Sequence, residues 1–98
     1  MIKKIKNKKL KALYEGGNGR GLNPNHVEDL EEILQALDEA TAPQQMDLPG
    51  FGFHELSGDR RGYYSVHVNG PWCVTFTFDG ADADQVNYEQ YHDKKVKR

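Results

Sequence analysis

Hydrophobic residues near the start of the chain change from an alternating to a helical spacing. Ile2 and Ile5 stand among lysines, a pattern that is compatible with a short edge strand. Leu10, Leu13 and Tyr14 then fall at i, i+3 and i+4, which predicts one apolar stripe of a short helix. The glycines at positions 16 and 17 predict the end of this helix.

A second helix has the clearest pattern in the chain. Its apolar residues step by threes and fours and predict one buried face: Val27, Leu30, Ile33, Leu34 and Leu37. The Asn-Pro pair at positions 23 and 24 predicts an N-cap and a first-turn proline, whereas Asn25 offers a competing start in capping-box register with Glu28. The helix is expected to run to about Ala40, because a proline follows at position 43.

After residues 43–53, which are rich in proline and glycine and predict an extended connection, the apolar spacing becomes alternating. Strands are predicted around residues 64–68 and 72–78, and a last strand is predicted to begin with Val86 and Tyr88, before Tyr91-His92. Asn-Gly at positions 69 and 70 and Asp-Gly at positions 79 and 80 predict the turns between them. The pattern therefore predicts an α+β fold, in which two N-terminal helices cover one face of a small antiparallel sheet.

The composition predicts one globular domain over residues 1–98. The chain is 98 residues long and 37% hydrophobic, which is enough for one core and leaves no room for a second. Its single cysteine, Cys73, excludes an intramolecular disulfide and a multi-cysteine zinc site. No apolar run approaches the ~18 residues of a membrane span, and no signal-peptide core follows the first lysines. A cytoplasmic protein without a membrane partner is therefore expected.

Charges are segregated along the chain, although the net charge is only −2. Residues 1–11 carry six lysines and no acid, and residues 94–98 add three lysines and Arg98. The stretch between them holds all fifteen acids and three arginines, a net charge of −12. Cations clustered beside an acidic body fit a polyanion such as RNA, and two solvated chain ends are the alternative that charge alone leaves open.

Three collinear motifs carry a family resemblance. Residues 56–66 read Leu-Ser-Gly-Asp-Arg-Arg-Gly-Tyr-Tyr-Ser-Val, residues 72–76 read Trp-Cys-Val-Thr-Phe, and Tyr91-His92 follows near the end. They resemble the L-x-G-[DN]-R-x-G-x-[WYH]-S-[IV] segment, the W-R-[IVL]-x-F strand and the terminal D-Y-H of HigB-type toxins, the killer proteins of plasmid maintenance systems in the RelE/ParE superfamily. The resemblance spans nearly the whole chain, in order and at the expected spacing.

The resemblance implies a RelE-like, microbial-ribonuclease-like fold and a toxin that enters the ribosomal A site. There it would cleave messenger RNA during translation, without a metal or another cofactor. The implied partners are the ribosome, messenger RNA and a HigA-like helix-turn-helix antitoxin that neutralises the toxin. Operator DNA would be contacted only indirectly, through the antitoxin.

Metal-free RNA cleavage needs a base for the 2′-hydroxyl, a cation for the charged phosphorane and an acid for the leaving oxygen. Histidine suits both proton roles because its unperturbed pKa near ~6.5 leaves both forms populated, and His54 and His92 are expected to share them. Arg60, the motif arginine, is expected to hold phosphate with its forked, permanently charged side chain. Tyr91 is expected to position the RNA by stacking or by a hydrogen bond.

Other cations are expected to contact RNA or the ribosome: Lys4, Lys6, Lys8, Lys9, Arg61, Lys94 and Lys95. Structural roles stay open for two of the site candidates. His54 would then be a loop histidine without a duty, and Arg60 a bridge to Asp59 or to a backbone carbonyl at the turn. His67 is expected to be solvated or partly covered on its strand, and His26 to be incidental.

Two positions depart from the family pattern. Cys73 stands where the pattern has arginine and Gln90 where it has aspartate, and both positions are expected to face the site. A thiol donates hydrogen bonds weakly and a thiolate carries the wrong sign, so Cys73 cannot replace an arginine. Either the chain relies on other cations, such as Arg60, Arg61 or the terminal lysines, or Cys73 is an inactivating change.

Two other functions remain open. A ParE-type inhibitor of DNA gyrase needs no RNA-cleaving residues and would produce cleaved DNA and an SOS response rather than arrested translation. The Tyr91-His92 ending belongs to the HigB pattern and speaks against this alternative. A catalytically degenerate toxin would bind its antitoxin tightly without arresting growth when it is expressed.

Overall fold

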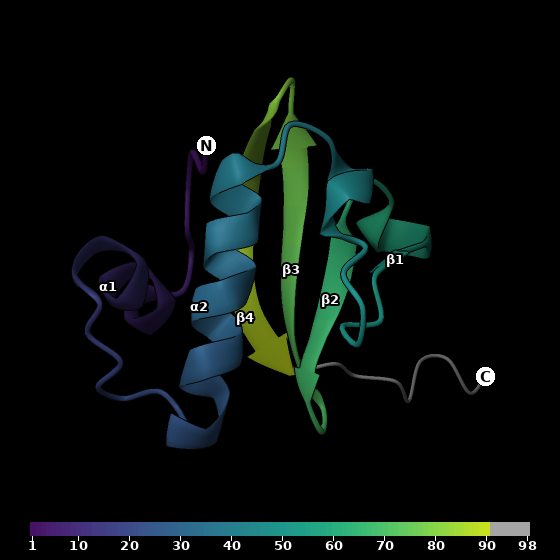
Figure 1. Cartoon of the computed structure of the whole chain (residues 1–98). Helices are drawn as coiled ribbons and strands as arrows, with labels where there is room; N and C mark the ends of the chain where they lie inside the picture. Colours follow the sequence, from purple (N-terminus) through teal and green to yellow (C-terminus); the bar gives the residue numbers. More distant parts are fainter. Residues whose placement is uncertain (91–98) are drawn as a thin grey trace.

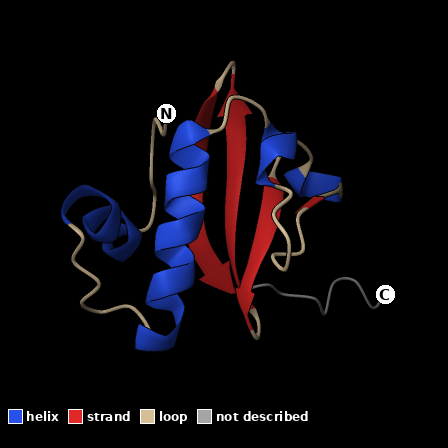
Figure 2. Ribbon diagram, viewed as in Figure 1, coloured by secondary structure: helices blue, strands red, loops and turns tan. Residues whose placement is uncertain are grey.

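Two helices and an antiparallel sheet form two layers in the computed structural model, which describes residues 1–90 (Figure 1, Figure 2). Helix α2 lies across one face of the sheet, and α1 lies beside α2 (Figure 1). The sheet has the strand order β1-β2-β3-β4. The elements are α1 (Lys8–Gly16), α2 (Pro24–Glu39), β1 (His54–Glu55), β2 (Tyr64–Asn69), β3 (Trp72–Asp79) and β4 (Asp82–Gln90), with short 3-10 helices at Pro43–Met46 and Gly58–Arg60. The α+β fold expected from the sequence is confirmed.

Both helices begin at asparagine caps. The Asn7 side chain accepts from the amide of Leu10 at 2.9 Å, and the Asn23 side chain accepts from the amide of Asn25 at 2.9 Å. Asn23 is therefore the cap of α2, and the competing start at Asn25 is not used. Gly17 ends α1 in the left-handed region, with φ 69°, as the glycine pair predicted. Within residues 1–90, neither helix is long and apolar enough to cross a membrane.

The sheet extends further than the predicted meander. Both turns form where Asn-Gly and Asp-Gly predicted them, between β2 and β3 and between β3 and β4. Strand β1 adds a short edge, because His54 pairs with Ser65. Strand β4 begins at Asp82 rather than near Val86, and its pairing with β3 shifts register at Gln85, which has φ 50°. Such a bulge interrupts the alternation that the sequence pattern relies on.

The first residues of the chain run along the free edge of β4. Ile2 pairs with Ala83 and Ile5 pairs with Val86, both in parallel orientation. The lysine-flanked edge segment expected from the sequence is therefore present as two isolated bridges rather than as a full strand.

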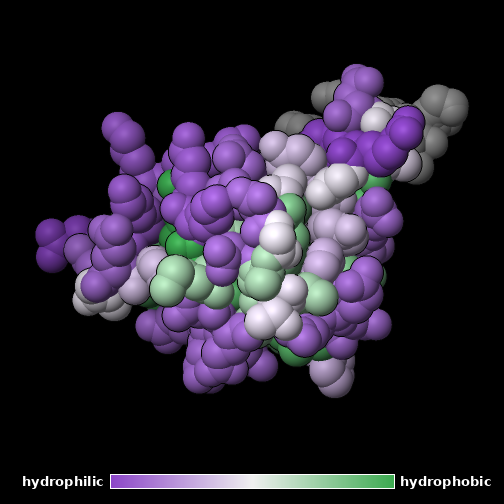
Figure 3. Space-filling view, turned by 90° about the horizontal axis from the view of Figure 1, so that it is seen from above, coloured by the Kyte–Doolittle hydropathy of each residue, from purple (hydrophilic) through white to green (hydrophobic). Residues whose placement is uncertain are grey.

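The core lies between α2 and the sheet. Its largest fully buried hydrophobic members are Leu10, Leu30, Ile33, Leu37, Met46, Val66, Val74, Phe76 and Val86. The connection between α2 and β1 was predicted to be extended, but Pro43–Met46 forms a 3-10 turn that buries Met46. Figure 3 shows a mostly hydrophilic surface, and among the large hydrophobic residues of the described chain only Met1 and Tyr14 count as exposed.

His26 is a core residue, so the expectation that it is incidental was wrong. It is only 3% exposed, and its Nδ1 lies 2.5 Å from the Tyr88 hydroxyl of β4. The Tyr88 ring stacks on Trp72 with 4.7 Å between the ring centroids. This contact joins the first turn of α2 to strand β4 on the sheet face that α2 covers. Spacing could not reveal it, because the partners are 62 positions apart.

Replacing His26 by alanine is expected to lower the free energy of unfolding by about 2–3 kcal/mol, since it leaves a buried tyrosine hydroxyl without its partner and opens a small cavity. His67 is the matched control because it is an exposed histidine, and His67→Ala is expected to change that free energy by less than about 0.5 kcal/mol. Urea unfolding followed by circular dichroism measures both variants. Equal losses in both would contradict the structural role of His26.

Candidate active site

Strand register collects polar side chains on the sheet face opposite α2, which we call the outer face. His54 pairs with Ser65, Ser65 with Thr75, and Thr75 with Asn87, and paired residues project on the same side of a sheet. The neighbouring row is His67, Cys73 and Glu89. Because Val66, Val74 and Phe76 alternate with these residues and fill the core, both rows lie away from α2. The outer face therefore carries the polar side chains of the described chain that are candidates for a functional site.

Arg60 is bound to this face by a carboxylate from β4. Its Nη2 donates to Glu89 Oε2 at 3.1 Å and its Nη1 to Glu89 Oε1 at 3.5 Å. The guanidinium also lies 4.8 Å from the centre of the Tyr63 ring. The partner of Arg60 is thus Glu89, rather than Asp59 or a turn carbonyl as the structural alternative had it.

Glu89 is the site residue that the sequence did not single out. Thr75, which is 2% exposed, donates its hydroxyl to Glu89 Oε2. Burial would raise the pKa of the Glu89 carboxyl, but hydrogen bonds from Thr75 and Arg60 and the charges of Arg60 and Lys6 hold it below its ordinary value. Glu89 is therefore ionised at neutral pH. The available signal was the strand alternation that places Glu89 beside Cys73.

His54 lies exposed on the short edge strand β1, and its ring orientation is fixed by one hydrogen bond. The His54 Nδ1 lies 3.1 Å from the backbone carbonyl of Gly52. A carbonyl can only accept, so Nδ1 carries a hydrogen and donates it, and in the neutral imidazole the lone pair is then on Nε2. This tautomer presents an unprotonated nitrogen that can accept a proton.

Cys73 lies on the outer face, as expected, but it is nearly covered there. It is 5% exposed, and its Sγ donates to the Glu89 backbone carbonyl at 3.6 Å. Burial raises the pKa of the thiol, the negative charge of Glu89 raises it further, and Ser65 and Arg60 oppose the shift. The residue is therefore a neutral thiol at neutral pH. It contributes no charge where the family pattern has an arginine.

Gln90 does not share the side of Cys73. It pairs with Trp72 at the end of β4 and has the alternation of Tyr88, which is buried on the α2 side. The expectation that position 90 faces the same site as position 73 was therefore wrong for the described strand.

The remaining candidates are spread over the molecule. Lys6 comes within 5.9 Å of the Tyr63 ring, beside the outer face, whereas Lys9 lies on α1 close to Gly21. His67 is exposed, as expected, and its Nε2–H donates to the Gly70 carbonyl at 2.9 Å. The other described cations that were predicted to contact RNA are exposed: Lys4, Lys8 and Arg61. Four predicted residues lie outside the described residues: Tyr91, His92, Lys94 and Lys95.

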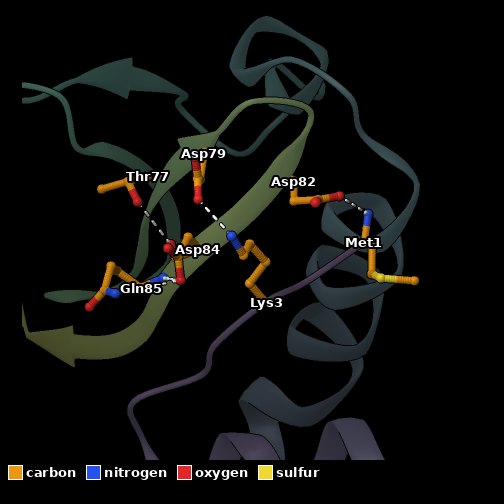
Figure 4. A network of polar contacts seen from close by, with 7 residues as sticks. All are labelled: Met1, Lys3, Thr77, Asp79, Asp82, Asp84 and Gln85. Carbon is orange, nitrogen blue, oxygen red and sulfur yellow. Dashed lines mark hydrogen bonds and ion pairs between the residues drawn. The ribbon is translucent and has the colours of Figure 1, made fainter.

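Two positive groups at the start of the chain pair with acids at the β3–β4 turn (Figure 4). Lys3 Nζ lies 2.6 Å from Asp79 Oδ2, and the amino group of Met1 lies 3.7 Å from Asp82 Oδ1. The hydrogen bond raises the pKa of Lys3 and lowers that of Asp79. These contacts hold the start of the chain along β4. Within residues 1–90, no group of three or more metal-ligating side chains is placed to hold a metal ion.

Two comparisons with known proteins agree with each other. Residues 3–92 match the family model described as the RelE-like toxin of the type II toxin-antitoxin system HigB. The chain is also 41% identical over 92 residues to the Endoribonuclease HigB of Proteus vulgaris, a match that covers 94% of this chain and 100% of that protein.

Proposed function

The chain belongs to the HigB family of RelE-like toxins of type II toxin–antitoxin systems, and from this premise we propose that it is a ribosome-dependent endoribonuclease that cleaves messenger RNA and stops translation. The similarity to a protein named an endoribonuclease over nearly the full length supports the reaction class. The observation that carries the proposal is the outer face, which holds a histidine whose Nδ1 is engaged by the Gly52 carbonyl and an arginine that reaches the same sheet face.

In the proposed reaction the 2′-oxygen of the RNA attacks the neighbouring phosphorus, and the bond from phosphorus to the 5′-oxygen breaks. His54 Nε2 accepts the proton of the 2′-hydroxyl. Arg60 holds the phosphate through N–H groups that Glu89 does not use. We assign the proton for the leaving 5′-oxygen to His92 and the positioning of the RNA to Tyr91, both outside the described residues, and we propose that no metal takes part.

The proposed partners follow from the same family membership. A type II toxin has an antitoxin, and we propose that it is a HigA-like helix-turn-helix protein that alone contacts operator DNA. Lys4, Lys6 and Arg61 are exposed and are proposed to contact RNA at the ribosome, together with Lys8 and Lys9 on α1. Lys94 and Lys95 are assigned the same role. The cytoplasm, where ribosomes work, is the proposed location.

Cys73 supports one competing function, a degenerate toxin that binds its antitoxin but no longer cleaves. The buried thiol replaces a charged group directly beside the Arg60–Glu89 pair. Losing one preorganised charged donor typically costs about 10²- to 10³-fold in rate. No comparable observation favours the alternative that the chain inhibits DNA gyrase, because the groups on the outer face are suited to RNA cleavage.

We expect this chain to cut messenger RNA at A-site codons in a purified translation system and to leave the same RNA intact without ribosomes. Primer extension on a defined messenger RNA maps the cuts, with Cys73→Arg assayed in parallel. Cuts by both proteins support the proposal, and cuts by Cys73→Arg alone identify the chain as a degenerate toxin.

Two controls make that assay decisive. A gyrase cleavage assay run on the same preparations detects the ParE-type alternative directly. Far-ultraviolet circular dichroism establishes that Cys73→Arg folds, since an arginine must enter a position that is 5% exposed. If neither folded protein cuts RNA on ribosomes, the ribonuclease proposal is wrong.

A further inference from the structure

The turn that carries Arg60 does not by itself fix the guanidinium. Arg60 ends the three-residue 3-10 turn Gly58–Arg60, in which Gly58 has φ 68°, and Gly62 follows shortly after with φ 93°. Its long side chain projects from this loop and is 41% exposed. An arginine in such a place populates many rotamers unless partners hold it. Among the described residues, the partners that reach its guanidinium are Glu89 and the Tyr63 ring.

Glu89 is better anchored than the arginine that it holds. It stands in the longest strand of the sheet, and its backbone pairs with that of Cys73 on β3. The buried hydroxyl of Thr75 donates to the same carboxylate oxygen that receives Nη2 of Arg60. The hydrogen bonds therefore run in series from Thr75 on β3 through Glu89 on β4 to the partly exposed side chain of Arg60.

We propose that Glu89, held by Thr75, is the positioning residue that presents the Arg60 guanidinium to the RNA phosphate. This inference rests on the proposed ribonuclease function. Arginine has five N–H donors, of which Glu89 engages one on Nη1 and one on Nη2. Three donors remain for a phosphate, so Arg60 need not release Glu89 to bind RNA.

The pairing has opposite effects on binding and on catalysis. An ionised carboxylate beside the phosphate site repels the RNA and weakens binding. The same carboxylate holds the guanidinium in one orientation, and a misplacement of about 1 Å in a catalytic group can cost about 10²-fold in rate. A positioning role thus predicts slower cleavage without weaker binding when Glu89 loses its charge. A merely structural role would weaken both or neither.

Side-chain NMR tests the contact without relying on cleavage. In the unchanged protein, the Nε–H and Nη–H signals of Arg60, assigned with Arg60→Lys, are expected to show slow guanidinium rotation. Glu89→Gln keeps the shape of the side chain and removes the charge, and it is expected to speed the rotation at least 10-fold. Thr75→Val is expected to act in the same direction, whereas Thr75→Ser, which keeps the hydroxyl, restores slow rotation.

Cleavage kinetics on programmed ribosomes test whether the Glu89–Arg60 contact affects the cleavage rate. With Glu89→Gln, the cleavage rate at saturating toxin is expected to fall about 10- to 100-fold, while the half-saturating toxin concentration stays the same or falls. Thr75→Val should follow Glu89→Gln, and Thr75→Ser should follow the unchanged protein. In the Arg60→Ala background, Glu89→Gln is expected to cause no further loss of rate, because the residue acts through Arg60.

The outcomes of these experiments distinguish a failure of this inference from a failure of the proposed ribonuclease function. Equally slow rotation of the Arg60 guanidinium in Glu89→Gln and in the unchanged protein overturns the inference, whether or not the chain cleaves RNA. Where the unchanged protein cleaves, an unaltered rate in folded Glu89→Gln also overturns it. Where the unchanged protein does not cleave, the ribonuclease function has failed. In that case the rotation measurement is combined with a titration with inorganic phosphate. If phosphate shifts the Arg60 signals equally in Glu89→Gln and in the unchanged protein, the inference is wrong.

Discussion

Replacing His54 by alanine is expected to lower the rate of messenger-RNA cleavage at saturating toxin by about 10²- to 10⁴-fold, the usual range for one positioned acid or base. Because Nδ1 donates to the Gly52 carbonyl, Nε2 is the nitrogen to which we assign the proton of the 2′-hydroxyl in the proposed reaction. The side chain is exposed on an edge strand, so its removal is expected to cost little stability. Single-turnover cleavage of a defined messenger RNA on programmed ribosomes measures the rate.

Asparagine at position 54 separates chemistry from structure. The amide nitrogen of the asparagine side chain can donate to the Gly52 carbonyl as Nδ1–H does, but nothing then occupies the place of Nε2. His54→Asn is therefore expected to lose as much activity as His54→Ala. If His54→Asn cleaved at the rate of the unchanged protein, His54 would be a structural residue of the loop and would not be the base.

The parts of the fold that the sequence predicted are those encoded by neighbouring residues. The stripe of α2, its Asn23 cap and the two Gly-containing turns each depend on side chains within a few positions of one another. Strand β1 was missed, because its two residues carry no alternation of their own and form a strand only by pairing with β2. The start of β4 was misplaced since Gln85, with φ 50°, bulges out of the alternating pattern.

The site was harder to predict, because its contacts join residues distant in sequence. His54 and Arg60 were candidates by residue type and motif, and the structure places both against the outer face. Glu89 was one of fifteen acids, and only folding brings it to Arg60, which is 29 positions away. Gln90 shows the opposite error. The family motif assigned it to the site, but its pairing with Trp72 and its alternation with Tyr88 place it on the α2 side.

The residue at position 73 affects how Arg60 pairs with Glu89. An arginine there would stand beside Glu89 on the next strand and compete with Arg60 for the same carboxylate. With the neutral thiol of Cys73 in its place, no cation on the next strand competes with Arg60, which shares the carboxylate with the Thr75 hydroxyl. Arg60 is then the cation to which we assign the phosphate, and we expect cleavage to depend strongly on it.

Replacing Arg60 by alanine is accordingly expected to lower the cleavage rate by about 10²- to 10³-fold, the range for losing one preorganised donor to a developing negative charge. Two effects add up in this variant. The phosphate loses its forked cation, and the Glu89 carboxylate, which is 26% exposed, is left to repel the RNA. Arg60→Lys restores the charge but not the fork and is expected to recover only part of the rate. Primer extension and single-turnover cleavage measure both variants.

Two controls test whether the slower cleavage by Arg60→Ala comes only from the lower net charge or from lower stability. Arg20→Ala removes the same charge from an exposed turn between the two helices, away from the outer face, and is expected to cleave at the rate of the unchanged protein. The Arg60–Glu89 pair is partly solvated, so Arg60→Ala is expected to change the free energy of unfolding by less than about 1 kcal/mol. A folded Arg60→Ala protein that cleaves as fast as Arg20→Ala would show that the phosphate is held by another cation, and the lysines at the two ends of the chain would be the next to test.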